Sequence, residues 1–152
     1  MTINLICIGK IREKYISDGI LEYLKRLSSS VNLNIIELKE INTDDINKNI
    51  EEEGKLILNQ LSNDYVITLE IEGKNIDSVT MSELIFDHYT YNASNICFVI
   101  GGSSGLSDEV KKRSNYKLSF GKMTYPHQLM RLILIEQIYR SFMIKSNSKY
   151  HK

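Results

Sequence analysis

Two loops in the C-terminal third of the chain have the composition of ligand-binding loops. An uninterrupted apolar run at residues 96–100 leads into the loop 101–105, which reads GGSSG. A second short run at residues 116–120 leads into the loop 121–126, which reads GKMTYP. Both runs are rich in aromatic or β-branched residues and predict strands. Because ligands bind at the carboxyl ends of strands in open α/β sheets, the two loops form the candidate site.

The glycine-rich loop 101–105 differs from the common phosphate-binding loops. It is not part of a G-x-x-x-x-G-K-[ST] sequence, nor of a G-x-G-x-x-G sequence with an acidic residue about twenty positions later. Its small residues still let a ligand approach the backbone and its N–H donors closely. A plain tight turn is the alternative interpretation.

His127 and Arg131 are the side chains best suited to chemistry beside the second loop. They are four residues apart at the start of a predicted helix, so they share one face of it. A histidine can accept a proton near neutral pH, and an arginine can stabilise developing negative charge. A lone histidine is also often structural. Glu136 and Arg140 lie on roughly the opposite side and are expected to form a structural ion pair.

The predicted final helix, residues 127–146, is apolar on more than one side. Ten apolar residues occupy more than one face at helical spacing: Leu129, Met130, Leu132, Ile133, Leu134, Ile135, Ile138, Tyr139, Phe142 and Met143. A helix of this kind must be buried on two sides. Because a small domain offers one sheet face to cover it, the second side favours a homodimer interface. A helix sunk in the core of a single chain is the alternative.

The remaining segments alternate between strand and helix patterns. The expected strands span residues 4–8, 33–38 and 65–69, and the expected helices span 13–27, 44–63, 82–91 with Ser82 as N-cap, and 107–113 as a short helix or turn. Alternation of this kind predicts an α/β fold with a mainly parallel sheet and helices on both faces. The length suits one domain over residues 1–152. The third strand ends at Leu69 in a turn-rich segment, 70–74, which adds a third strand end to the candidate site.

The charge distribution points to an anionic partner. Net charge is zero, but residues 111–152 carry ten basic residues and one acidic residue, and residues 1–110 carry nine basic and eighteen acidic residues. The halves therefore hold +9 and −9, an asymmetry typical of proteins that bind nucleic acid. A solvated surface that is basic at one end is the alternative. Glu51, Glu52 and Glu53 are interpreted as a solvated helix face without a chemical role.

Composition argues against several other classes of protein. Cys7 and Cys97 lie within apolar runs and are expected to be reduced core residues of a cytoplasmic protein. No cluster of histidines and cysteines supports a metal site. No apolar run approaches the roughly 18 residues that cross a bilayer, and the N-terminus lacks the features of a secretory signal.

The motifs of the C-terminal third resemble those of the RlmH family, which are bacterial SPOUT-class methyltransferases. The resemblance rests on four stretches, IGGSSGL at 100–106, SFGKMTYPHQLMR at 119–131, EQIYR at 136–140 and the ending YHK at 150–152. It extends through residues 7–10 and 68–70 and so covers essentially the whole chain.

The resemblance implies an S-adenosylmethionine-dependent enzyme that methylates N3 of the pseudouridine at position 1915, in helix 69 of 23S ribosomal RNA. It also implies a C-terminal trefoil knot and an obligate homodimer. The family's cofactor contacts carry over to Leu69, Gly101, Phe120, Gly121, Lys122, Met123, Thr124 and Tyr125. Relatives often have serine at the position of Gly121, so only a backbone contact is expected there.

Methylation of N3 requires the loss of its proton. The candidates for this step are His127, Tyr139 and His151, with Arg131 able to bind the substrate and stabilise charge on the ring oxygens. In the family the polar tail lies near the active site, so its last residues are expected to contact RNA, within one chain or across the dimer interface: Lys149, Tyr150, His151 and Lys152. A non-catalytic dimeric module that binds a nucleotide or RNA in the same pocket is the alternative function.

Overall fold

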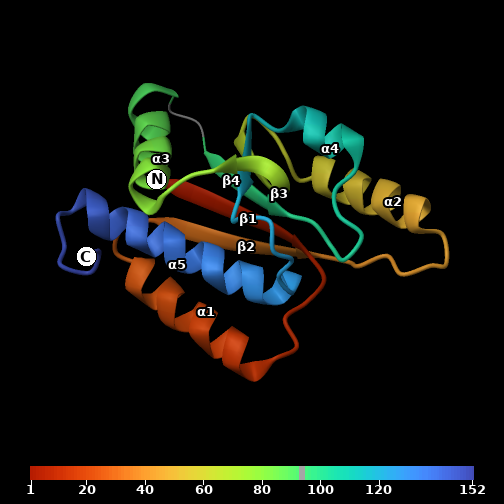
Figure 1. Ribbon diagram of the computed structural model, residues 1–152, viewed down its shortest axis with the longest axis horizontal. Coiled ribbons are helices and arrows are strands. Elements are labelled where there is room, and N and C mark those ends of the chain that lie inside the picture. The colour runs from red at the N-terminus through yellow and green to blue at the C-terminus, as the bar shows by residue number, and fades with distance from the viewer. Residues whose placement is uncertain (93–94) are drawn as a thin grey trace.

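A computed structural model describes residues 1–92 and 95–152. Five strands form one parallel sheet in the order β2-β1-β4-β3-β5 (Figure 1). The strands are β1 (Thr2–Ile8), β2 (Asn32–Leu38), β3 (Tyr65–Asn75), β4 (Ile96–Ile100) and β5 (Tyr116–Ser119). The helices are α1 (Lys14–Leu27), α2 (Ile46–Leu58), α3 (Ser78–Asn92), α4 (Asp108–Arg113) and α5 (His127–Lys145). The α/β class and the parallel sheet are thus confirmed.

Helices cover both faces of the sheet. One hydrophobic cluster joins the sheet to α1, α3 and α5, and a second joins it to α2 and α4. All five residues of β4 are buried, as expected of a central parallel strand covered on both faces. Cys7 and Cys97 are free thiols buried in this core, and burial raises the pKa of each to about 12.

Helix α5 lies between α1 and α3 on its face of the sheet (Figure 1). It approaches α1 so closely that a Cβ added to Gly19 would lie 3.0 Å from Leu132 Cδ1. Neighbouring helices in the same chain therefore cover part of the apolar surface that favoured a subunit interface. Leu129, Leu132 and Ile133 remain only half-buried, and the homodimer stays a prediction. The trefoil knot also stays a prediction.

Three predicted boundaries are wrong. Helix α2 ends at Leu58 rather than at residue 63. Strand β3 does not end at Leu69 but continues to Asn75 through a bulge, with Leu69 and Lys74 both opposite Leu118 of β5. A bulge places extra residues on one strand and bends it, so the charged segment looks like a turn in the sequence. Helix α3 begins at Ser78 rather than at Ser82, and Asp77 accepts a hydrogen bond from the Thr80 amide (2.7 Å).

Two residues that were expected on the surface or at a helix end belong to the core. Ser82 is buried and donates to the Ser141 carbonyl of α5 (2.8 Å). Glu53 is also buried, at 3% exposure, instead of lying on a solvated face. Its Oε1 accepts the backbone N–H of Ile41 (2.9 Å). The exposed Glu51 beside it fits the expected solvated face.

Within residues 1–92 and 95–152, no helix is long and apolar enough to cross a membrane. The same residues contain no group of three or more histidine, cysteine and acidic side chains placed to hold a metal ion.

Candidate active site

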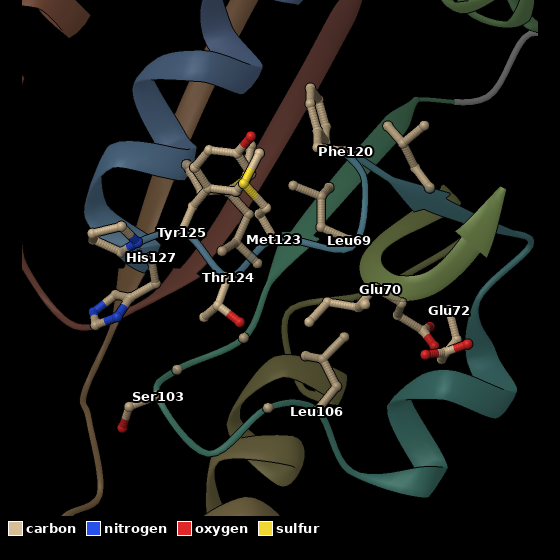
Figure 2. A pocket seen from close by; sticks show the side chains of 18 of the residues that line it. Leu69, Glu70, Glu72, Ser103, Leu106, Phe120, Met123, Thr124, Tyr125 and His127 are labelled. Carbon is tan, nitrogen blue, oxygen red and sulfur yellow. The ribbon is translucent and has the colours of Figure 1, made fainter. Parts of the chain in front are cut away.

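A cavity of about 770 Å³ opens at the bulge of β3 and at the carboxyl ends of β4 and β5. Figure 2 shows that its walls come from the bulged end of β3, the glycine loop after β4 and the loop between β5 and α5. The lining residues are Leu69, Glu70, Ile71, Glu72, Ile100, Gly101, Gly102, Ser103, Gly105, Leu106, Lys111, Leu118, Phe120, Gly121, Met123, Thr124, Tyr125, Pro126, His127 and Met130. The three strand ends that the sequence singles out thus meet at one place.

The cofactor contacts expected from the resemblance mostly lie in this cavity. Leu69, Gly101, Phe120, Gly121, Met123, Thr124 and Tyr125 line it. Lys122 is exposed and does not. Sequence reasoning did not assign roles to Glu70, Ile71 and Glu72, which enter because the bulge of β3 turns their segment toward the cavity. The alternation of apolar and acidic residues from Leu69 to Glu72 is the signal that a strand continues there.

The glycine loop is both a cavity wall and a tightly packed turn. The amide of Gly105 donates to the Gly102 carbonyl (3.1 Å), and Gly105 has a φ of 88°, which strains any residue with a side chain. A Cβ on Gly101 would lie 3.0 Å from Leu106 Cδ2 and 3.1 Å from the Gly105 carbonyl carbon. Any side chain at residue 101 must therefore reshape the loop.

Ser119 joins the second loop to the end of β3. Its hydroxyl donates to the Ile71 carbonyl (2.9 Å) and accepts the amide of Gly121 (3.1 Å). Asn75 Nδ2 also donates to the Ser119 carbonyl (3.2 Å). Gly121 has a φ of 106°, so its backbone takes a path that favours glycine. These contacts hold two walls of the cavity at a constant separation.

The end of the cavity formed by β3 and α4 carries charge. Glu70 is held by the Thr68 hydroxyl, which donates to its Oε1 (2.6 Å), and Lys117 Nζ lies 4.0 Å from its Oε2. Glu72 and Lys111 line the same cavity. Figure 2 places Glu70 and Glu72 far from His127, so the cavity has a charged end and a histidine end.

His127 occupies the other end of the cavity, at the first residue of α5. The side chain is half-buried. Burial and the nearby guanidinium of Arg131 hold the pKa of His127 below its usual value of 6.5, although Glu40 acts in the opposite direction. The imidazole is therefore mostly neutral at pH 7, and a neutral imidazole can accept a proton.

Arg131 lies behind His127 and outside the cavity lining. It is fully buried, and its Nη2 donates to the carbonyl oxygens of Ile8 (2.6 Å) and Gly9 (2.8 Å). Glu37 lies 3.9 Å from its Nη1. Arg131 thus ties α5 to the end of β1. This position supports a role in placing His127, while direct contact with a substrate stays a prediction.

The remaining predicted residues gather at the opposite end of α5. The Tyr139 ring lies 4.9 Å from the Tyr150 ring between their centroids, and the Tyr150 hydroxyl donates to Glu136 (3.0 Å). His151 Nδ1 lies 3.4 Å from Arg140 Nη1, within hydrogen-bonding distance. Lys149 and Lys152 are exposed. The expected Glu136–Arg140 ion pair is confirmed at 2.7 Å.

Two groups of candidate residues are therefore separated within one chain. Tyr139 follows His127 by twelve residues, which is about 18 Å along a helix that rises 1.5 Å per residue. Burial and hydrogen bonding with Tyr23 and Glu136 raise the pKa of Tyr150, so its hydroxyl stays protonated at neutral pH. A single chain does not bring the tail to the cavity.

Comparison with known proteins identifies the family of the chain and agrees with its fold. The family described as "Predicted SPOUT methyltransferase" matches residues 1–151. Full-length relatives include proteins named ribosomal RNA large subunit methyltransferase H from Fusobacterium nucleatum (56% identical) and from Clostridium botulinum strain Alaska E43 (49% identical), with 100% of both chains covered in each case. A solved structure of a probable methylase family protein from Haemophilus influenzae has a similar fold, with a TM-score of 0.50 and 12% identity over 97% of this chain and 67% of that one. The chain belongs to the ribosomal RNA large subunit methyltransferase H (RlmH) family of SPOUT methyltransferases.

Proposed function

We propose that this protein transfers a methyl group from S-adenosylmethionine to N3 of the pseudouridine at position 1915, in helix 69 of 23S ribosomal RNA. The reaction takes place in the cytoplasm on the assembled ribosome, and the whole chain, residues 1–152, acts as one SPOUT domain. The observation that carries the proposal is the convergence of the two loops and the bulged segment of β3, with the family's motif residues, on one cavity.

The cavity suits an adenosyl ligand with an amino acid tail. Leu69, Leu106 and Phe120 supply apolar walls for a flat base, and the two loops supply backbone close to the ligand. The charged end formed by Glu70, Glu72 and Lys111 suits the ammonium and carboxylate groups of a methionine tail. The cofactor supplies an electrophilic methyl group, and the residues of the chain supply its orientation.

His127 is the residue we assign to removal of the N3 proton. It lines the cavity, and its lowered pKa keeps the imidazole neutral and able to accept the proton at pH 7. Arg131, fixed by the carbonyl oxygens of Ile8 and Gly9 at the end of β1, positions α5 behind it. A positioned base contributes about 10²- to 10⁴-fold to a rate. Alignment of the methyl group with N3 can contribute more.

The tail serves the site of a second copy. In a two-fold symmetric dimer in which α5 packs antiparallel against its counterpart, the end of one α5 lies beside the start of the other. The docked tail of one protomer, with Tyr150 and His151, then lies near the partner's cavity. The separation of about 18 Å within one chain, estimated from the rise of α5, supports this arrangement over action in cis.

The direct test is mass spectrometry of ribosomal RNA from cells with and without the gene. Loss of one methyl group from the helix 69 fragment in the deletion strain, and its return with the plasmid-borne gene, is the expected result. Purified protein, labelled methyl donor and unmethylated ribosomes should reproduce the transfer. An unchanged mass spectrum in the deletion strain would contradict the proposal.

A non-catalytic binding module is the second candidate function. The same experiment separates the two, because a module of this kind binds the ligand or RNA but leaves the methylation of helix 69 unchanged. The neutral His127 at the cavity favours the enzyme.

A further inference from the structure

Glu53 of α2 is a buried acid that the proposed reaction does not use. Its side chain is 3% exposed. Oε1 accepts the Ile41 amide, whereas Oε2 has no hydrogen-bond partner among the described residues. Leaving a carboxylate oxygen buried and unpaired costs free energy, so its position calls for an explanation.

The unpaired oxygen is directed at the glycine loop. A Cβ built on Gly102 would lie 3.0 Å from Oε2, and Gly102 itself lines the cavity. Residue 102 has no side chain, so the Gly102 backbone lies beside the carboxyl group on one side and lines the cavity on the other. The charge therefore lies behind the cavity wall, shielded from bulk solvent and its salt.

Among the residues that the structure describes, no cation forms an ion pair with Glu53 or appears among the groups that shift its pKa. Burial raises the pKa of Glu53 above its usual value and the nearby Glu40 adds to this, although the Ile41 N–H acts in the opposite direction. Besides Glu53, the nearest side chain that a Cβ on Gly102 would meet is Ile8 of β1, which is uncharged. By contrast, Glu70 at the cavity's charged end has Lys117 4.0 Å away. Glu53 Oε2 has neither a hydrogen-bond partner nor a cation beside it among the described residues.

We propose that Glu53 is a specificity-determining residue whose buried carboxylate favours a positively charged ligand, the sulfonium methyl donor, over its uncharged sulfide product. This inference rests on the proposed function. S-adenosylmethionine carries a positive sulfur, and S-adenosylhomocysteine differs by the loss of one methyl group and that charge. A charge held behind a single layer of backbone, in a partly screened site, is sufficient to change relative affinity by about tenfold.

Calorimetry on the full chain tests the inference through one ratio, the dissociation constant of S-adenosylhomocysteine divided by that of S-adenosylmethionine. Glu53→Gln removes the charge and keeps the size, so the ratio should fall about five- to tenfold, mainly through weaker binding of the donor. Glu53→Asp keeps the charge and should hold the ratio within about twofold. Glu52→Gln is the matched control, because Glu52 lies on the same helix but is half-exposed, 4.0 Å from Lys48, and it should leave the ratio unchanged.

The results of these measurements distinguish a role of Glu53 in ligand specificity from a role in packing. Equal weakening of both ligands in Glu53→Gln, or a larger defect in Glu53→Asp than in Glu53→Gln, would overturn the inference and assign Glu53 a purely structural role. Failure of both variants to fold, measured by thermal unfolding, would do the same. If the wild type binds both ligands but substitution of Glu53 leaves the ratio of dissociation constants unchanged, this inference alone is contradicted. If the wild type binds neither ligand, both the proposed cofactor and this inference are contradicted.

Discussion

At the scale of single residues, His127 is the side chain whose surroundings match its assigned task. Desolvation and the Arg131 charge both disfavour the imidazolium form, so the proton-accepting form persists below the usual pKa of 6.5. Because only the neutral form accepts a proton, activity should be constant at pH values above the pKa of His127. It should decline as the pH falls through the lowered pKa.

The pH dependence of methyl transfer checks this assignment. Single-turnover transfer to ribosomes between pH 5 and pH 8 should show an acidic limb with a midpoint below 6.5. His127→Gln should lower the plateau by about 10²- to 10⁴-fold and remove the limb. The same limb in His127→Gln would assign the titration to another group.

Gly101 is a residue of the cavity wall at which a side chain would change the shape of the loop. In Gly101→Val the new side chain meets Leu106 and the Gly105 carbonyl, so the loop must move and binding of the methyl donor should weaken at least tenfold, about 1.4 kcal/mol. Calorimetry measures the loss. Ser104→Ala, in the same loop but outside the cavity lining, is the control and should bind normally. Normal binding by Gly101→Val would place the ligand elsewhere.

At the scale of elements, the contact between α2 and α4 depends on a glycine. A Cβ on Gly54 would lie 2.3 Å from Ser107 Oγ and 2.8 Å from Ser107 Cβ, and the Ser107 hydroxyl caps α4 by accepting the Val110 amide (3.3 Å). Gly54→Ala should therefore lower the free energy of unfolding by about 1–3 kcal/mol, measured by urea denaturation.

A second substitution separates this clash from helix propensity. Alanine is the better helix former, so without the clash Gly54→Ala would stabilise the protein. Adding Ser107→Gly removes the colliding atoms and should recover part of the loss, despite the weaker cap. An unfolding midpoint that is unchanged or raised in the single variant would contradict the packing described for α2 and α4.

The order of the elements could be predicted from local patterns, but some of their limits could not. Strand β4 is a continuous apolar run, and α1 has a regular amphipathic pattern, so each is recognisable from its own residues. The continuation of β3 beyond Leu69 depends on pairing with β5, more than forty residues later. The burial of Glu53 depends likewise on the distant glycine loop. Contacts between segments so far apart in the sequence cannot be predicted from a local residue pattern.

In the candidate site, too, some features could be predicted from local sequence and others could not. The strand-end loops were recognisable from composition and supplied most of the cavity wall. Arg131 was predicted beside His127, but its burial against the Ile8 and Gly9 carbonyls follows from the approach of α5 to β1, which helical spacing does not reveal.

At the scale of the whole molecule, a homodimer is the arrangement that would bring the tail to a cavity. Light scattering at micromolar concentration should give about twice the chain mass of 17.6 kDa. Leu129→Asp should shift the protein toward monomer, because it places a charge on the half-buried face of α5. A stable wild-type monomer would contradict the dimer and the arrangement of the tail.

Removal of the last three residues tests the tail itself. The truncation should leave dimer mass and donor affinity within about twofold, because these residues lie outside the cavity lining of their own chain. Transfer to ribosomes should fall at least a hundredfold, the low end of the cost of a lost acid–base or positioning group. Full activity of the truncated protein would show that the tail is dispensable.

Mixing two inactive proteins distinguishes action in cis from action in trans. Heterodimers of the truncated chain with Gly101→Val contain one intact cavity facing one intact tail if the tail acts across the interface. Activity should then return at one of the two sites. Mixtures that stay inactive, with heterodimers verified by mass spectrometry, would favour action within one chain.

The position of α5 has a consequence for how the chain is made. Ile3 and Leu5, near the N-terminus, share a buried cluster with Leu134 and Ile138, and Arg131 bonds to backbone more than 120 residues earlier. One face of β1 therefore stays uncovered until α5 has been synthesised. Folding of this half of the core must follow the synthesis of α5, and pairings so distant in sequence close slowly. Nascent chains halted before α5 should consequently bind chaperones and resist proteases poorly, even with every strand already synthesised.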